Sequence, residues 1–196
     1  MRVLNEAKKE TVRDTALQMI VEEGFKGLSM QKLAKAADIS PATIYIYYKD
    51  REDLLNQLYL YVYNTSNHSA LENFSADMPF SEGMKVLWLN RFNYFTAHPY
   101  HSFFLEQFIN SPLITAAVQL EDNTYRTQMK AFYSNAVKKG EVKKLDIEIY
   151  WSIAFSPLYQ LIKFHNQKGP HPQKPKGITR NKVLQCLEMV LTALKP

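Results

Sequence analysis

Residues 29–51 constrain the fold more than any other stretch, because two helix starts lie there on either side of one tight turn. Ser29 and Ser40 each stand before a helix-forming run, and serine is among the preferred residues at the N-cap position. Pro41 follows Ser40 directly, and its fixed φ suits the first position of a helix. Between the two runs, Asp38 begins a turn-prone segment. Two short helices joined in this way are typical of a DNA-binding helix-turn-helix.

Helical periodicity extends over most of the remaining chain, and no segment has the alternating pattern of a strand. The first helix is predicted over residues 5–23, where Val12, Ala16 and Ile20 recur every fourth position, and Gly24 should end it. A proline inside the helix predicted at 146–167, Pro157, should kink or split it. The other helices are predicted over residues 51–71, 81–98, 100–110, 112–139 and 179–194. The predicted fold class is therefore all-α, with about nine helices.

The helix-turn-helix and the helix before it would form a bundle too small to be stable alone. We therefore expect residues 1–50 to form a DNA-binding domain, residues 51–72 to form a connector helix, and residues 73–196 to form a second domain. Residues 73–80 include Asp77 and Pro79, so this segment should be the loop where the second domain begins.

Lys and Arg outnumber Asp and Glu by 24 to 19, a formal net charge of +5, which permits nucleic-acid binding. The excess lies outside the predicted DNA-binding domain, because residues 1–52 contain nine Lys and Arg against eight Asp and Glu. The single Cys186 excludes an internal disulfide and fits a reducing compartment. The first residues lack the apolar core of a signal peptide, and no apolar run approaches the roughly 20 residues of a membrane span. We therefore expect a cytoplasmic protein without a membrane segment.

Several short pieces of the N-terminal region have a characteristic joint spacing. They are Ala16 with Gly24-Phe25, Leu28-Ser29, Lys32-Leu33-Ala34, Ile39-Ser40, Thr43-Ile44-Tyr45, Tyr47-Tyr48-Lys49-Asp50-Arg51 and Leu54-Leu55. In this spacing the first 55 or so residues resemble the DNA-binding domain of the tetracycline-repressor (TetR) family of bacterial transcription regulators. The later residues resemble that family in length, helical content and aromatic richness. The resemblance implies a regulator that binds double-stranded operator DNA, forms a homodimer and responds to a small-molecule effector.

The second helix of the motif should have one buried and one exposed face. Ile44 and Tyr48 share an arc that belongs in the domain core. A second arc could meet base edges, where methyl and ring groups contact thymine, and it consists of Pro41, Ala42, Tyr45 and Ile46. The resemblance implies base contacts from Pro41, Ala42 and Tyr45, phosphate contacts from Thr43, Tyr47 and Arg51, and further DNA contacts from Ser29, Met30 and Gln31. The alternative is that the tyrosines are only core residues of a small bundle.

Aromatic residues are unusually frequent, with 12 Tyr, 11 Phe and 2 Trp, and many follow residue 80. Aromatics at helical spacing are more often core residues, but so many flat rings can leave gaps that suit an apolar or aromatic ligand. The resemblance implies an effector pocket here. The candidate pocket residues are Trp88, Phe92, Phe95, Phe104, Phe108, Tyr125, Met129 and Phe155, and candidate polar orienting groups are Asn90, Arg91, Gln128 and Gln160.

The last two predicted helices each have an apolar stripe. These stripes contain Tyr150, Ala154, Leu158 and Leu161 on one helix, and Val183, Leu187, Val190, Leu191 and Leu194 on the other. Two such stripes can close across a two-fold axis as a four-helix bundle, so we expect a homodimer interface formed by them. The alternative is that both stripes face the core of their own domain.

Catalysis finds little support in the sequence. His98 and His101 are separated by Pro99, without nearby carboxylates or cysteines that would complete a metal site, and the chain has no Gly-rich phosphate loop. We therefore expect no enzyme activity, no metal and no cofactor. The predicted function is transcription regulation, as a repressor released from its operator by a small apolar or aromatic effector. The alternatives are a helix-turn-helix factor without an effector, of an architectural or division type, and a helical ligand carrier or enzyme.

Overall fold

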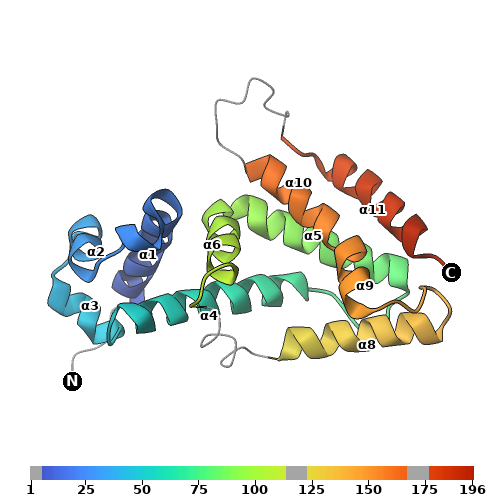
Figure 1. The fold of residues 1–196 in the computed structure, drawn as a ribbon, viewed down its shortest axis with the longest axis horizontal. Helices are drawn as coiled ribbons and strands as arrows, with labels where there is room; N and C mark the ends of the chain where they lie inside the picture. The colour runs from blue at the N-terminus through green and yellow to red at the C-terminus, as the bar shows by residue number, and fades with distance from the viewer. Residues whose placement is uncertain (1–5, 114–122, 167–176) are drawn as a thin grey trace. The chain divides into compact units, whose positions relative to one another are not determined.

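The computed structural model describes residues 6–113, 123–166 and 177–196, and all regular structure within these ranges is helical (Figure 1). The predicted all-α class is confirmed. The helices are α1 (Glu6–Gly27), α2 (Met30–Ala36), α3 (Pro41–Tyr47), α4 (Arg51–Ala70), α5 (Phe80–Ala97), α6 (Pro99–Ile109), α8 (Thr124–Lys138), α9 (Ile147–Ala154), α10 (Ser156–Asn166) and α11 (Arg180–Leu194). None of the described helices is both long and apolar enough to cross a membrane.

Two of the predicted helix breaks are confirmed and one predicted helix is wrong. Gly24 has φ 72° and ψ 175°, which is not helical, so the regular part of α1 stops there. Pro157 does split its helix: α9 ends at Ala154, and the proline stands in the first turn of α10, where its missing N–H is tolerated. The single helix predicted over 112–139 is not formed, because Pro112 lies in a turn and α8 begins at Thr124. Residues 114–122 lie outside the described residues.

The described helices form two compact units, and α4 belongs to both, with the boundary between Asn64 and Thr65. The first unit contains α1, α2, α3, the larger part of α4, and α6 from Tyr100 onward. Its buried core includes Val12, Ala16, Ile20, Leu33, Ile44, Leu54, Leu55, Leu58, Phe104 and Phe108. The domains expected at 1–50, 51–72 and 73–196 therefore do not coincide with these units, because α6 packs with the N-terminal helices.

In the second unit, α5 is the central helix, and α8, α10 and α11 each pack against it. Trp88 of α5 is fully buried and donates its indole N–H to the carbonyl oxygen of Ala154 at 2.9 Å. Asn166, at the end of α10, donates to the carbonyl oxygen of Phe95 at 3.0 Å. These buried side-chain bonds hold α9 and α10 to the same central helix.

Candidate functional site

The turn between α2 and α3 has the hydrogen bonds of a Schellman motif. The Ile39 N–H donates to the Ala34 carbonyl at 3.0 Å, and the Asp38 N–H donates to the Lys35 carbonyl at 3.3 Å. Asp38 has φ 53°, the left-handed conformation that such a turn requires and that aspartate tolerates better than most residues. Ile39 then packs against the core of the unit, which fixes the direction in which α3 begins.

Serine caps start both helices of the motif, as the sequence predicted. The Ser29 hydroxyl accepts a hydrogen bond from the Lys32 N–H, and the Ser40 hydroxyl accepts one from the Thr43 N–H, each at 3.2 Å. Each cap satisfies a backbone donor that the first turn of a helix leaves without an intrahelical acceptor. Pro41 occupies the first position of α3. The seven residues of α3 are thus held between a capped start and the turn before it.

The two faces of α3 are those that the sequence predicted. Ile44 and Tyr48 are buried in the unit core, and burial raises the pKa of the Tyr48 hydroxyl to about 12. On the other face, the side chain of Tyr45 is 54% exposed and that of Ile46 is 44% exposed. Large hydrophobic side chains so exposed on a small, capped helix form a surface that can meet another molecule. Pro41 and Ala42 are exposed on the same helix.

The supporting helix α2 contributes fewer side chains than expected. Gln31 is exposed and remains a candidate for a base contact. Met30 is only 8% exposed, because its apolar side chain packs in the core, and a DNA contact by this residue stays a prediction. The Lys32 ammonium lies 3.7 Å from a carboxylate oxygen of Glu23, and both side chains are largely exposed, so this ion pair adds little stability.

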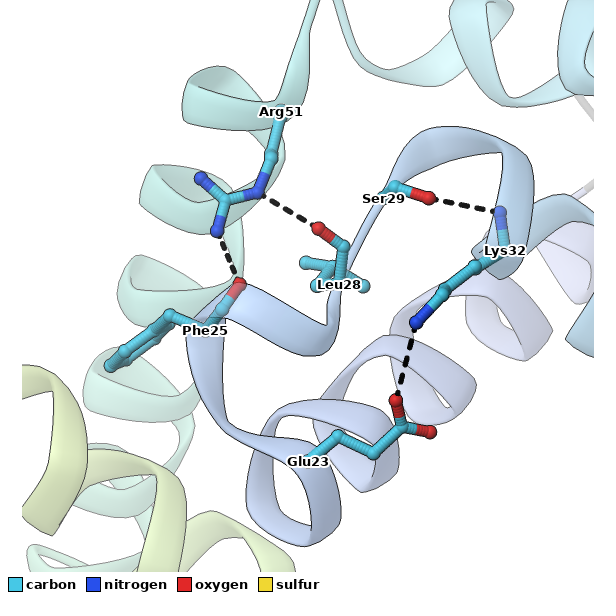
Figure 2. A network of polar contacts seen from close by, with 6 residues as sticks. All are labelled: Glu23, Phe25, Leu28, Ser29, Lys32 and Arg51. Atoms are coloured by element: carbon cyan, nitrogen blue, oxygen red, sulfur yellow. Dashed lines mark hydrogen bonds and ion pairs between the residues drawn. The ribbon is translucent and has the colours of Figure 1, made fainter.

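Arg51, at the start of α4, is bound to the backbone that precedes α2 (Figure 2). Its Nε donates to the Leu28 carbonyl at 3.1 Å, and one terminal nitrogen donates to the Phe25 carbonyl. A guanidinium has several donors in a rigid fork, so it can hold two carbonyl oxygens at once. Arg51 therefore positions the helix-turn-helix against α4. A phosphate contact by this residue, which the resemblance implied, stays a prediction.

The predicted pocket residues belong to different units. Phe104 and Phe108 lie in the core of the first unit, where Phe25 makes edge contacts with both and the rings of Tyr59 and Phe108 stack with centroids 4.7 Å apart. These two residues therefore belong to a different unit from the other candidates, because α6 packs with the N-terminal helices. The candidates that lie in the second unit are all buried, and they are Trp88, Phe92, Phe95, Tyr125, Met129 and Phe155.

A buried polar cluster lies in the same unit as these aromatics. The Arg91 side chain is 4% exposed and donates to the side-chain oxygen of Asn67 at 2.7 Å. The guanidinium carbon of Arg91 lies 4.6 Å from the ring centroid of Tyr125. The side-chain amide of Asn90, by contrast, donates to the backbone carbonyls of Ala70 and Glu72, so it gives hydrogen-bond partners to carbonyl oxygens at and just after the end of α4. Sequence analysis missed Asn67, because its position in the expected connector helix gave no sign of a site.

The predicted dimer stripes face inward. The structure supports the alternative, in which the stripes cover the core of their own unit. Seven of the nine side chains are buried within one protomer, and they are Tyr150, Ala154, Leu158, Val183, Leu187, Val190 and Leu194. Only Leu161 and Leu191 keep partial exposure. Within the described ranges, no group of three or more His, Cys, Asp or Glu side chains is placed to hold a metal ion.

Helix α3 begins at a serine cap and exposes one face on a small helical bundle, and α4 continues from this bundle into the second unit. These features define a helix-turn-helix DNA-binding protein. The family model described as bacterial regulatory proteins, tetR family, matches residues 12–58. A second family model, described as a tetracyclin repressor-like C-terminal domain, matches residues 79–171. The chain belongs to the TetR family of bacterial transcription regulators. The expectation that it is a regulator and no enzyme agrees with both models and with its relatives.

Three relatives illustrate this membership. An uncharacterized HTH-type transcriptional regulator of Haemophilus influenzae is 26% identical over 144 residues, covering 74% of this chain and 75% of that protein. The crystal structure of a TetR family transcription regulator from Marinobacter aquaeolei is 25% identical with a TM-score of 0.85, covering 99% of this chain and 98% of that one. The transcriptional regulator FadR from Bacillus subtilis, solved in complex with stearoyl-CoA, has a TM-score of 0.75 at 17% identity, covering 95% and 99%. At that identity the likeness concerns the fold alone.

Proposed function

We propose that this protein is a cytoplasmic, homodimeric repressor that a small apolar or aromatic effector releases from its operator. The observation that carries the DNA-binding part is the exposed face of α3, with Tyr45 and Ile46 directed away from the core of a capped helix-turn-helix. Methyl and ring groups on such a face can contact thymine in the major groove. The same motif has the exposed cations Lys32, Lys35 and Lys49, which can contact phosphates.

The proposed switch uses the two units of the chain. Effector binding in the second unit would favour one arrangement of the two DNA-binding units in the dimer. The helix α4 is continuous across the unit boundary, and Arg51 at its start holds the helix-turn-helix, so α4 is the proposed connection. Two half-sites lie about 34–36 Å apart on DNA, so a change of a few ångströms would remove one recognition helix from its groove. The aromatic interior and the stearoyl-CoA bound to FadR support an apolar ligand.

The dimer interface is proposed on the outward faces of α10 and α11. Leu161 and Phe164 of α10, and Leu184 and Leu191 of α11, are apolar side chains that keep partial or full exposure in one protomer. Burying such faces against a second copy would form a four-helix contact across a two-fold axis. We expect Leu161→Glu to give a monomer in light scattering after size exclusion. Met189→Glu is the control, since Met189 is 74% exposed on another side of α11 and should leave the dimer intact.

A gel-shift experiment with the DNA upstream of the protein's own gene tests the regulator function. Specific, salt-sensitive retention of a palindromic site is expected. Tyr45→Ala should lower the preference for the operator over unrelated DNA, because this change removes a base contact. Lys49→Met should weaken binding to all sequences, because it removes a phosphate contact. Retention of unrelated DNA as strong as retention of the upstream site would refute the proposal.

One observation favours the alternative of a DNA-binding factor without an effector. The aromatic candidates of the second unit are all at most 9% exposed, as in a filled core. A filled core predicts that no small apolar molecule raises the melting temperature or releases DNA. The effector proposal predicts that at least one does both.

A further inference from the structure

The polar cluster around Arg91 contains buried donors that have no acceptor among the described residues. The amide nitrogen of Asn67 and the hydroxyls of Tyr125 and Tyr150 are all inaccessible and make no hydrogen bond within the part of the chain that the structure describes. Buried polar groups in folded proteins nearly always have a partner, so three such groups in one unit require an explanation. By contrast, the half-buried hydroxyl of Tyr133 in the same unit has a partner: it donates to the Leu145 carbonyl at 2.9 Å.

These groups are neighbours, although they come from different helices. Asn67 at the end of α4 accepts from Arg91 of α5, whose guanidinium lies over the ring of Tyr125 of α8. Burial, with a smaller contribution from Tyr125, raises the pKa of the Tyr150 hydroxyl of α9, so this hydroxyl stays a donor. The cluster therefore combines a cation and three neutral donors from four helices.

The surroundings of the cluster are apolar, and one side reaches the surface. The ring of Tyr150 has Phe155 and Phe80 as neighbours, with ring centroids 6.4 and 6.5 Å away. Tyr159 of α10 lies with its ring centroid 6.0 Å from the guanidinium carbon of Arg91, and its side chain is 41% exposed.

We propose that the Arg91, Asn67, Tyr125 and Tyr150 cluster binds the carboxylate of an amphipathic organic acid, whose apolar body lies among the aromatic rings of the second unit. A carboxylate has two oxygens and several lone pairs, so it can accept from a guanidinium and from three neutral donors together. A neutral alcohol offers one oxygen and would leave donors unsatisfied. A phosphate dianion would bring more charge than a single guanidinium balances in an apolar site. This inference rests on the proposed function and specifies the chemical class of its effector.

The test compares acids with alcohols of the same shape on the full-length protein. The probes are octanoate with 1-octanol and benzoate with benzyl alcohol, and binding is measured by calorimetry and by the shift in melting temperature. We expect at least one acid to bind at least tenfold more tightly than its alcohol. Tyr125→Phe should weaken the binding of that acid by about tenfold or more, because a hydrogen bond to a charged group is lost. Binding of the matched alcohol should change little.

Tyr125→Phe is informative because it removes a hydroxyl without a partner in the described residues, so the free protein should unfold no earlier than the wild type. Tyr133→Phe is the matched control. Its hydroxyl is already bonded to Leu145, so this variant should lose stability and keep its acid affinity. Equal acid affinity of Tyr125→Phe and wild type would overturn the proposal, as would acids that bind no better than their alcohols or probes that all fail to bind.

Operator retention, measured separately in the gel shift, distinguishes the two proposals. An acid that binds through Tyr125 and leaves the DNA complex intact supports the carboxylate site and refutes the effector switch. Release of DNA by the alcohols, with no effect of the acids, supports the switch and overturns the carboxylate site.

Discussion

Replacing Arg51 by methionine separates two roles that this residue could have. In the structure its guanidinium donates to the carbonyls of Phe25 and Leu28, which lie more than twenty residues earlier in the chain. Methionine keeps much of the apolar stem and removes both donors. If the contact positions the helix-turn-helix, the variant loses stability even without DNA. If Arg51 only contacts phosphate, the free protein is unaffected.

The size of the effect follows from the two bonds. Hydrogen bonds with a charged partner contribute about 1.5–3 kcal/mol each. The Arg51 side chain is only partly buried, and water can solvate the carbonyl oxygens that it leaves, so the low end of this range applies to each bond. We therefore expect Arg51→Met to lower the free energy of unfolding by about 3 kcal/mol. Arg51→Lys should recover part of this loss at most, because an ammonium cannot reproduce the fork of a guanidinium.

Urea unfolding followed by circular dichroism measures the stability, and a salt titration of operator binding measures the phosphate contacts. Lys49→Met is the control for charge, since the lysine is exposed and its backbone N–H, not its side chain, donates to Asp53. That variant should unfold like the wild type and reduce the salt dependence of binding by roughly one phosphate contact. The positioning role would be refuted if Arg51→Met unfolded like the wild type and showed the same reduced salt dependence of operator binding as Lys49→Met.

Three further predictions concern stability. Gly83→Ala should destabilise the protein by about 1–3 kcal/mol in urea unfolding, because the added methyl group would lie 2.5 Å from ring atoms of Phe132. This clash exceeds the usual gain of alanine in a helix. A neutral or stabilising result would contradict this packing. Ser40→Ala should cost about 1 kcal/mol and weaken operator binding, because the Thr43 N–H loses its cap, and Ser40→Asp should restore both. The pKa of Tyr48 is raised from 10.0 to about 12, so the native state binds the hydroxyl proton more tightly than the unfolded state does. This contribution to the free energy of unfolding is complete below pH 10 and is lost as pH rises through 12. Tyr48→Phe should reduce the loss of stability in that interval, with tyrosinate absorbance as the readout.

The helix-turn-helix was predictable because its signals are local. The cap bond joins Ser40 to the Thr43 N–H three positions later, and the two bonds of the α2–α3 turn join residues three and five positions apart. The burial of Ile44 and the exposure of Tyr45 follow from helical periodicity once the helix is placed. Pro157 likewise splits its helix through a local effect, because its ring removes the backbone N–H and clashes with the carbonyl of the preceding turn.

The second unit was less predictable, because an apolar stripe indicates that a face is buried without indicating what covers it. The stripe with Leu158 and the stripe with Leu187 are each compatible with a core face and with a dimer face, and only the packing on α5 decides between the two. In the same way, Phe108 has the spacing of a pocket residue, yet its ring stacks on Tyr59 in the other unit.

By itself, the sequence determined the helical class, the helix-turn-helix and the family resemblance, since caps, turns and periodicity act over a few residues. Tertiary structure decided that Arg51 holds the backbone before α2 and that Asn67, Arg91 and Tyr125 form one buried polar cluster. Those contacts join residues more than twenty positions apart. Their formation depends on how whole helices pack, and no local pattern in the chain encodes it.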